Sequence, residues 1–376
     1  ITLDAVFDGV LPVNLPGGQV GWAVGSQGRM IESRQFVPGE FYNGNTPCAW
    51  PVGQRPLPNG HPDFNGCTLN EPGPFGFFGT NPPDYYDQQS FSLFGETSLP
   101  ITDDINVQAA VRREEFSGGL GATVYKLSGK WQVMDPLAFR ASFGTNFQAP
   151  PITLQPGNIS NVVRSYTVAG GAWLAGSSVT RTDITPEEAE SWNIGAIWQS
   201  QGFSSDHDLT VILDYFDIHT MGEIGEIAPH NFIADAVFEN VGGTFFADCS
   251  HPLIGRVDFN DNPVTNPGGG CTQGVTTALD LNRITTEIGN GSDQFTSGFD
   301  YQINYRFPIG EADATFGLTG TSLTELSTSA RVLDGFEVTP EDDRLGNLNF
   351  SSVGFAAPKH RINAFFNYNR GDHNAR

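Results

Sequence analysis

The sequence predicts an all-β fold, and more narrowly part of an antiparallel transmembrane β-barrel with long loops on one side. Three observations lead to this prediction. About eleven segments alternate apolar and polar residues with a period of two, several run to ten residues or more, and their connections are mostly short and long in turn. Strands that cross a bilayer at a tilt need about nine to eleven residues, and such barrels have short turns on one side and long loops on the other.

The predicted strands are, in order, residues 1–8, 19–33, 88–99, 104–116, 121–133, 137–147, 189–200, 207–220, 294–307, 312–325 and 359–370. Successive side chains of a strand point to opposite faces, so alternation gives each strand one apolar and one polar face. In chain order, the clearest apolar faces are Val20, Trp22 and Val24; Ile105, Val107, Ala109 and Val111; Leu137, Phe139, Ala141, Phe143 and Phe147; Trp192, Ile194, Ala196 and Trp198; Leu209, Val211, Leu213 and Tyr215; Phe295, Phe299, Tyr301, Ile303, Tyr305 and Phe307; and Ile362, Ala364, Phe366 and Tyr368.

Two places depart from the alternation. The phase slips near Phe216 and Ile218, which predicts a β-bulge there, and Phe365 falls on a polar face. The polar faces should line the interior with charged and amide side chains. Those we expect there are Arg140, Asp300, Asn304 and Arg306.

The long connections are predicted at about 34–87, 148–188, 221–293 and 326–358. All four cysteines fall in them: Cys48 and Cys67 in the first, Cys249 and Cys271 in the third. Neither pair has a C-x-x-C metal or redox spacing, so we expect two local disulfides made in an oxidising compartment. Each would contribute roughly 3 kcal/mol in the chain-entropy model. The alternative is free buried thiols, which suit such polar segments poorly.

Composition excludes several function classes. The net charge is −23, so the chain lacks the basic footprint that nucleic acid or an anionic membrane surface requires. Many acids fall in the long connections, either as solvated loop residues or as a vestibule that attracts cations. No stretch approaches 18 apolar residues, so no transmembrane helix is expected, and the N-terminus shows no signal peptide.

Several motifs resemble the barrel of TonB-dependent outer-membrane receptors, in that family's order, across nearly the whole chain. They are GQVGWAVGSQGRMIESR (18–34), FSLFGETSLPI (91–101), VRREEFSGGLGATVYKLSGKWQ (111–132), LAFRASFGTNFQAPP (137–151), ITPEEAESWNIGAIWQ (184–199), GFDYQINYRF (298–307) and PKHRINAFFNYNRGDHNAR (358–376). Gln148 stands where this family more usually has a basic residue.

The resemblance implies about eleven strands of an expected 22, with the plug domain and the closing strands outside this sequence. It implies a bacterial outer-membrane location, contact with outer-membrane lipid, and uptake of a scarce nutrient such as an iron chelate, cobalamin or carbohydrate. The TonB energy-transducing complex would act through the missing plug. The ligand itself is not readable from the sequence.

Candidate ligand residues are the aromatic side chains of the first long loop. They are Trp50, Phe64, Phe75, Phe77 and Phe78, whose alternative role is packing around the disulfide. We expect no enzyme activity, cofactor or metal: Glu187, Glu188 and Glu190 lack a nucleophile and more simply open a strand, and His219 and His230 are more simply solvated loop residues than iron ligands.

Two other functions compete with active transport. One is a passive porin-like outer-membrane channel. The other is a secreted β-rich adhesin or carbohydrate-binding protein, because alternating strands also build soluble sandwiches and propellers. Strands this long and loops of this length are uncommon in such compact domains.

Overall fold

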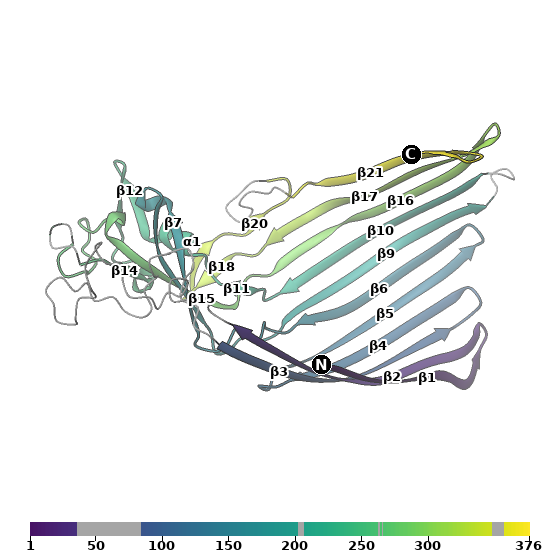
Figure 1. Cartoon of the computed structure of the whole chain (residues 1–376), viewed down its shortest axis with the longest axis horizontal. Helices are drawn as coiled ribbons and strands as arrows, with labels where there is room; N and C mark the ends of the chain where they lie inside the picture. The colour runs from purple at the N-terminus through teal and green to yellow at the C-terminus, as the bar shows by residue number, and fades with distance from the viewer. Residues whose placement is uncertain (36–83, 202–206, 262–263, 265, 348–356) are drawn as a thin grey trace.

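The computed structural model describes residues 1–35, 84–201, 207–261, 264, 266–347 and 357–376. Figure 1 shows a broad, curled sheet of long tilted strands with a smaller body of short strands at one end. The predicted all-β fold class is confirmed.

The large sheet follows the chain from one edge to the other, and every pair of neighbours in it is antiparallel. Short β20 (Asp342–Asp343) pairs with β17 beside this path. The path runs through β1 (Thr2–Leu15), β2 (Gly18–Gln35), β3 (Asp84–Pro100), β4 (Ile105–Phe116), β5 (Gly121–Met134), β6 (Leu137–Gln148), β9 (Glu187–Gln201), β10 (Asp208–Met221), β16 (Gln294–Ile309), β17 (Ala312–Thr328), β21 (His360–Arg370) and β22 (His373–Ala375).

Each of the eleven predicted segments coincides with one long strand of this sheet, with ends that differ by a few residues. The exception is β1, which continues to Leu15. Most short turns lie at the end of the sheet drawn at the right of Figure 1, whereas the short connection between β4 and β5 and the smaller body lie at the opposite end. The strands of the sheet therefore form a wall whose two ends differ.

One face of the sheet, here called the outer face, is apolar and exposed. Aromatic rings from neighbouring strands meet on it: Trp192 lies 5.1 Å from Tyr215, which lies 5.0 Å from Phe299, measured between ring centroids. An apolar face of this length that no other element covers is suited to contact with lipid. In lipid, a sheet is stable when it closes into a barrel, because every backbone polar group is then paired. Other exposed apolar residues on this face are Leu93, Val111, Leu127, Trp131, Phe139, Ile194, Leu213, Ile362 and Phe366.

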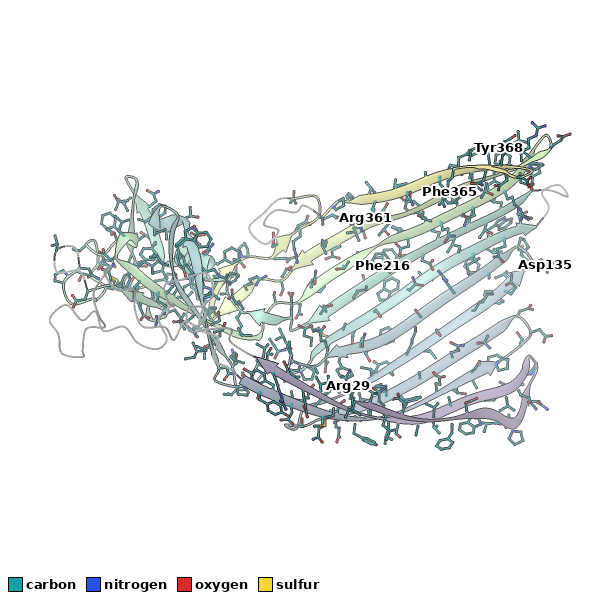
Figure 2. The ribbon with its side chains drawn as sticks, viewed as in Figure 1. Arg29, Asp135, Phe216, Arg361, Phe365 and Tyr368 are labelled. Carbon is teal, nitrogen blue, oxygen red and sulfur yellow. A yellow bond between two sulfur atoms is a disulfide. The ribbon has the colours of Figure 1, made fainter. Side chains whose placement is uncertain are left out.

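The opposite, inner face is polar. Phe216 and Phe365 nevertheless lie on it, and each has room because a glycine lies directly opposite on the neighbouring strand. Phe216 is opposite Gly298 across the β10–β16 pair, and Phe365 is opposite Gly317 across the β17–β21 pair. Figure 2 labels both rings. A β-carbon on either glycine would come within about 3 Å of the facing ring. The register of β10 is continuous with both neighbouring strands, so the predicted bulge near Phe216 is wrong. Its ring lies over a glycine, and successive side chains still point to opposite faces of the sheet.

The smaller body, here called the end domain, is built from residues between 149 and 341. The predicted long connections 148–188, 221–293 and 326–358 thus contain elements that the sequence did not reveal. One of its sheets combines β7 (Ile159–Tyr166), β8 (Ala172–Thr180), β11 (Ile224–Glu226), β14 (Val257–Phe259) and β15 (Leu281–Asn290), with β8 and β15 parallel. Beside it lie hairpins β12 (Phe238–Val241)–β13 (Thr244–Ala247) and β18 (Arg331–Leu333)–β19 (Phe336–Thr339), helix α1 (His230–Val237), and 3-10 turns η2 (Thr167–Ala169), η3 (Ile254–Arg256) and η4 (Ala278–Asp280).

The end domain has its own hydrophobic core. Tyr166, Ile233, Leu253, Leu281 and Ile284 are among its fully buried side chains, and they come from distant parts of the chain. The β12–β13 hairpin turns at two successive glycines with positive φ, which a two-residue hairpin of this kind requires. No described helix has both the length and the apolar character needed to cross a membrane.

Candidate functional site

The inner face of the sheet carries a charge pair that spans three strands. Arg140 on β6 donates two hydrogen bonds to Asp214 on β10, from Nε at 2.8 Å and from Nη2 at 2.5 Å. Between them lies Gly195 on β9, and a β-carbon there would be 1.8 Å from an Asp214 carboxylate oxygen. The glycine therefore leaves the space through which this two-pronged pair forms.

A hollow of about 410 Å³ opens beside this pair, between β10 and β21. Asp300 on β16 lies there and accepts a 2.6 Å hydrogen bond from the Thr321 hydroxyl on β17. Arg361, at the start of β21 (Figure 2), also lines the hollow. Within the described part of the chain, no hydrogen bond or ion pair to the Arg361 side chain is found. The remaining lining residues include Gln302, Thr319 and Asn363.

A second inner-face cluster lies on β1, β2 and β4. Glu114 is buried, and its carboxylate accepts hydrogen bonds from Arg112 Nε at 3.1 Å and Nη2 at 2.8 Å. Arg112 also donates to the Gln27 side chain at 3.0 Å, and Gln27 donates to Asp4 at 2.7 Å. The inner wall therefore satisfies many of its own charges, strand against strand.

Two side chains fasten the end domain to the sheet. Asn290 accepts from the Thr185 backbone N–H at 2.8 Å and donates to the carbonyls of Thr185 at 3.0 Å and Gly222 at 2.9 Å. Asp293 accepts from the Gly222 N–H at 2.9 Å and from His219 Nε2 at 3.0 Å. These bonds draw together the chain segments that enter and leave β9, β10 and β16, so the end domain is held at several points.

Inside the end domain, Glu226 gathers polar groups from three elements. Its carboxylate accepts from Ser178 at 3.0 Å and Arg164 at 3.3 Å, and lies 3.6 Å from Nδ1 of the buried His230. Burial opposes the charged carboxylate, but His230, Arg164 and Ser178 outweigh it and lower the pKa of Glu226 to about 2. His230 also bonds through Nε2 to the Ser177 carbonyl at 3.1 Å, which joins α1 to β8. The carboxylate thus stays charged and ties the domain together.

Arg256 makes a second cross-link in the end domain. It binds Asp334 through two 2.8 Å hydrogen bonds and Glu287 through one of 2.8 Å. The hydrogen bonds from Arg256 lower the pKa of the Asp334 carboxyl, and Arg181 in the same way lowers that of Asp183. Because Arg181 also lies 3.6 Å from Glu287, ion pairs join three separate connections of the chain, as the core does.

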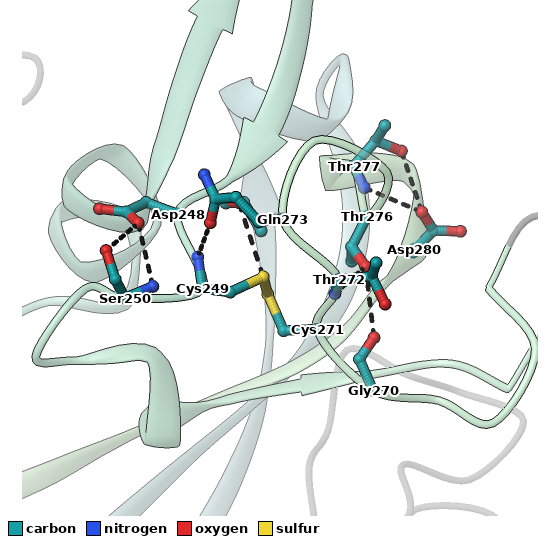
Figure 3. Close-up of a disulfide and its surroundings, with 11 residues drawn as sticks. Asp248, Cys249, Ser250, Gly270, Cys271, Thr272, Gln273, Thr276, Thr277 and Asp280 are labelled. Carbon is teal, nitrogen blue, oxygen red and sulfur yellow. Dashed lines mark hydrogen bonds between the residues drawn. A yellow bond between two sulfur atoms is a disulfide. The ribbon is translucent and has the colours of Figure 1, made fainter.

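A disulfide joins Cys249 to Cys271, with Cα atoms 5.6 Å apart, and so forms one of the two predicted bridges (Figure 3). Beside it, the Cys249 N–H donates to the Gln273 side chain at 2.8 Å. The other predicted pair and all five candidate ligand aromatics stay predictions. They lie outside the described residues: Cys48, Cys67, Trp50, Phe64, Phe75, Phe77 and Phe78.

Of the other sequence candidates, Glu187, His219 and His230 have side-chain partners. Glu187 accepts the Ile224 N–H at 2.5 Å, where β9 meets the end domain. The expectation that His219 and His230 are solvated loop residues is wrong: His219 lies in β10 and bonds to Asp293, and His230 is buried in α1. In the described ranges, no set of three or more His, Cys, Asp or Glu side chains is placed to hold a metal ion.

Alternation alone placed Arg140 and Asp300 on the polar face, but it did not reveal their partners. Asp214 and Gly195 were missed. A signal existed for both, since each falls in phase with the polar positions of its own strand. What was missing was the register that brings the two strands together, which depends on contacts distant in sequence.

A family model described as "TonB dependent receptor-like, beta-barrel" matches residues 25–375. Solved structures with a similar fold include the siderophore receptor PirA from Acinetobacter baumannii, at 14% identity and a TM-score of 0.53, covering 99% of this chain and 40% of that one. A mutant of the ferric enterobactin receptor PfeA from Pseudomonas aeruginosa gives 12% identity and a TM-score of 0.56, covering 99% and 39%. The chain thus spans about two fifths of the length of these structures. No curated protein sequence matches it.

Proposed function

Because this chain belongs to the TonB-dependent receptor family, we propose that it forms part of the barrel wall and the extracellular end of a bacterial outer-membrane receptor for a scarce nutrient. The sheet would cross the outer membrane, with the end domain outside the cell. The TonB complex would drive uptake through a plug domain of the whole protein. The proposal assigns no catalytic step to this chain.

The observation that carries the proposal is the contrast between the two faces of the sheet. The outer face exposes aromatic and aliphatic side chains from β3 to β21, whereas the inner face carries paired charges such as Arg140–Asp214. The first face is suited to contact with lipid, and the second is suited to line a polar barrel interior. Long connections at one end supply surface on which a ligand can be captured.

The experiment uses the full-length parent protein in its own host. We expect it in the outer-membrane fraction, closed to ions in planar bilayers, and crosslinked to TonB in cells. Constant open conductance without crosslinking to TonB would favour a passive channel instead. Recovery only from the soluble fraction would contradict both membrane functions and favour the adhesin or carbohydrate-binding alternative.

We also propose that the aromatic side chains of the first long connection contact the ligand. The support is their density in a segment that begins and ends at the same end of the sheet as the end domain. Aromatic rings stack on sugars and on aromatic ligands. Alanine at Trp50 should lower nutrient-limited growth that depends on the receptor, whereas alanine at Trp131, on the outer face, should leave it unchanged.

A further inference from the structure

One rank of directly opposed residues crosses the inner face from β4 to β21. Its members carry charges of both signs, with small residues between them. In order they are Asn106, Lys130, Arg140, Gly195, Asp214, Asp300, Thr321 and Arg361. Because each is the register partner of the next, the rank follows the sheet as a continuous belt.

The acids of this rank are already occupied. Asp214 is buried and takes both hydrogen bonds from Arg140 across Gly195. Asp300 accepts the hydroxyl of Thr321. Arg361 follows Thr321 on the next strand, and within the described ranges its guanidinium makes no hydrogen bond, ion pair or ring contact. Arg361 is therefore a cation whose neighbouring carboxylate, Asp300, is engaged by a neutral partner.

The hollow beside Arg361 is lined by several hydrogen-bond donors as well as by the carboxylates of Asp214 and Asp300. Gln302 and Asn363 contribute side-chain amides, Thr319 a hydroxyl, and Arg361 a guanidinium, around a space of about 410 Å³. A planar guanidinium presents paired N–H groups that match the two oxygens of a carboxylate. Side-chain amides beside it can donate to the same group.

We propose that this hollow is a carboxylate-binding site centred on Arg361, within the barrel interior. The inference rests on the proposed function, since it requires an interior that other parts of the protein or its cargo enter. Two sources supply the same chemistry: an acidic side chain of the segment that fills the barrel, or a carboxylate on the nutrient. The Asp214 charge is compensated by Arg140, so Asp300 is the carboxylate that restricts where an anion can lie beside Arg361.

The first test is a structure of the full-length parent without cargo. A carboxylate from the barrel-filling segment within hydrogen-bond distance of the Arg361 guanidinium would support the proposal and identify the source. An acidic side chain on the next barrel strand in that position would overturn it. A filled barrel with only water at Arg361 leaves the cargo as source, which the second test decides.

The second test compares Arg361→Gln with Arg306→Gln in the full-length protein. Arg306 is a matched control, because it is an inner-face arginine that pairs with Asp208 outside the hollow. If the segment is the source, Arg361→Gln should raise channel opening in planar bilayers by roughly ten- to a hundredfold, the range for one lost charge-assisted hydrogen bond. Arg361→Lys should restore part of the closure.

If the cargo is the source, Arg361→Gln should leave the channel closed but reduce receptor-dependent growth under nutrient limitation by a similar factor. Unchanged conductance together with unchanged growth would overturn the proposal. Heat-modifiable mobility of each variant on gels checks that the barrel has assembled. Failure of the proposed function is distinguishable, since it would show as loss of outer-membrane location in the unmodified protein.

Discussion

The sheet and the end domain belong to one chain, yet the sheet exposes apolar side chains and buries a charged one, whereas the end domain buries apolar side chains. In the sheet, apolar residues such as Leu213 and Phe139 lie exposed on the outer face, while charged Asp214 is buried on the inner one. In the end domain, Ile284 and Leu253 are buried and the charges lie around them. The first arrangement is stable only against lipid, and the second is that of a water-soluble domain.

The difference shows that the sheet and the end domain are stabilised by different interactions. In the sheet, strand pairing and inner-face ion pairs hold the register, and the lipid takes the apolar side chains. In the end domain, tertiary packing, a disulfide and ion pairs such as Arg256–Asp334 join segments that are far apart in sequence. Substitutions can therefore test the stability of the two regions separately.

The largest effect is expected at Gly195, where the inner face depends on the missing side chain. Gly195→Ala places a β-carbon where the Asp214 carboxylate lies, so the pair with Arg140 separates and a buried charge is left alone. The loss should be about 3–5 kcal/mol in the free energy of unfolding, measured by denaturant titration in lipid. Gly129→Ala on β5 is the control, because its nearest neighbour would be 3.7 Å away. Equal losses at both sites would show that Gly195 has no special role.

The next effect tests the two kinds of apolar burial directly. Ile284→Ala should cost about 2–5 kcal/mol, because it leaves a cavity in the closed core of the end domain. Leu213→Ala should cost much less, since lipid chains can fill the space on the outer face. Hydrogen-exchange protection, read separately for the two regions, measures both. A large loss at Leu213 would mean that this face packs against protein.

A third pair of variants checks the assignment of the faces. Leu213→Arg places a charge in lipid and should cost about 2–4 kcal/mol if Leu213 lies near the bilayer midplane. Gln302→Arg places the same charge on the inner face and should cost far less. Refolding into vesicles of defined lipid provides the measurement. If Gln302→Arg cost more than Leu213→Arg, the assignment of the inner and outer faces would be reversed.

The smallest effect is a response of the end domain to acid. Because the folded-state pKa of Glu226 is lowered to about 2, its contribution is fully present above the usual glutamate pKa and is lost as pH falls towards 2. Allowing for partial exposure, the loss should be about 2 kcal/mol. End-domain exchange protection should fall across that window in the native protein and change little with pH in Glu226→Gln. Protection of the sheet should respond less.

Much of the sheet could be predicted from local sequence, because alternation is a local property. The start of β16 and the faces of Phe299 and Asp300 follow from residues 294–307 alone, whereas the strand continues to Ile309. Phe216 shows the limit: its position suggested a bulge, and only its partner across the pair, Gly298, explains why a ring lies on the polar face. Most described strands of the end domain were missed because they are only three or four residues long, and β8 pairs in parallel with a strand about a hundred residues later.

The sequence by itself determined the long strands of the sheet, their two faces, and the end of the sheet at which most short connections lie. These features depend on neighbours two residues apart and on the length of each segment. Tertiary structure alone decided that Arg140 meets Asp214 over Gly195, that Arg361 lies beside the same hollow with no ion pair among the described residues, and that three connections share one core. Those contacts join residues tens to hundreds of positions apart, so they follow from the register and packing of the whole chain.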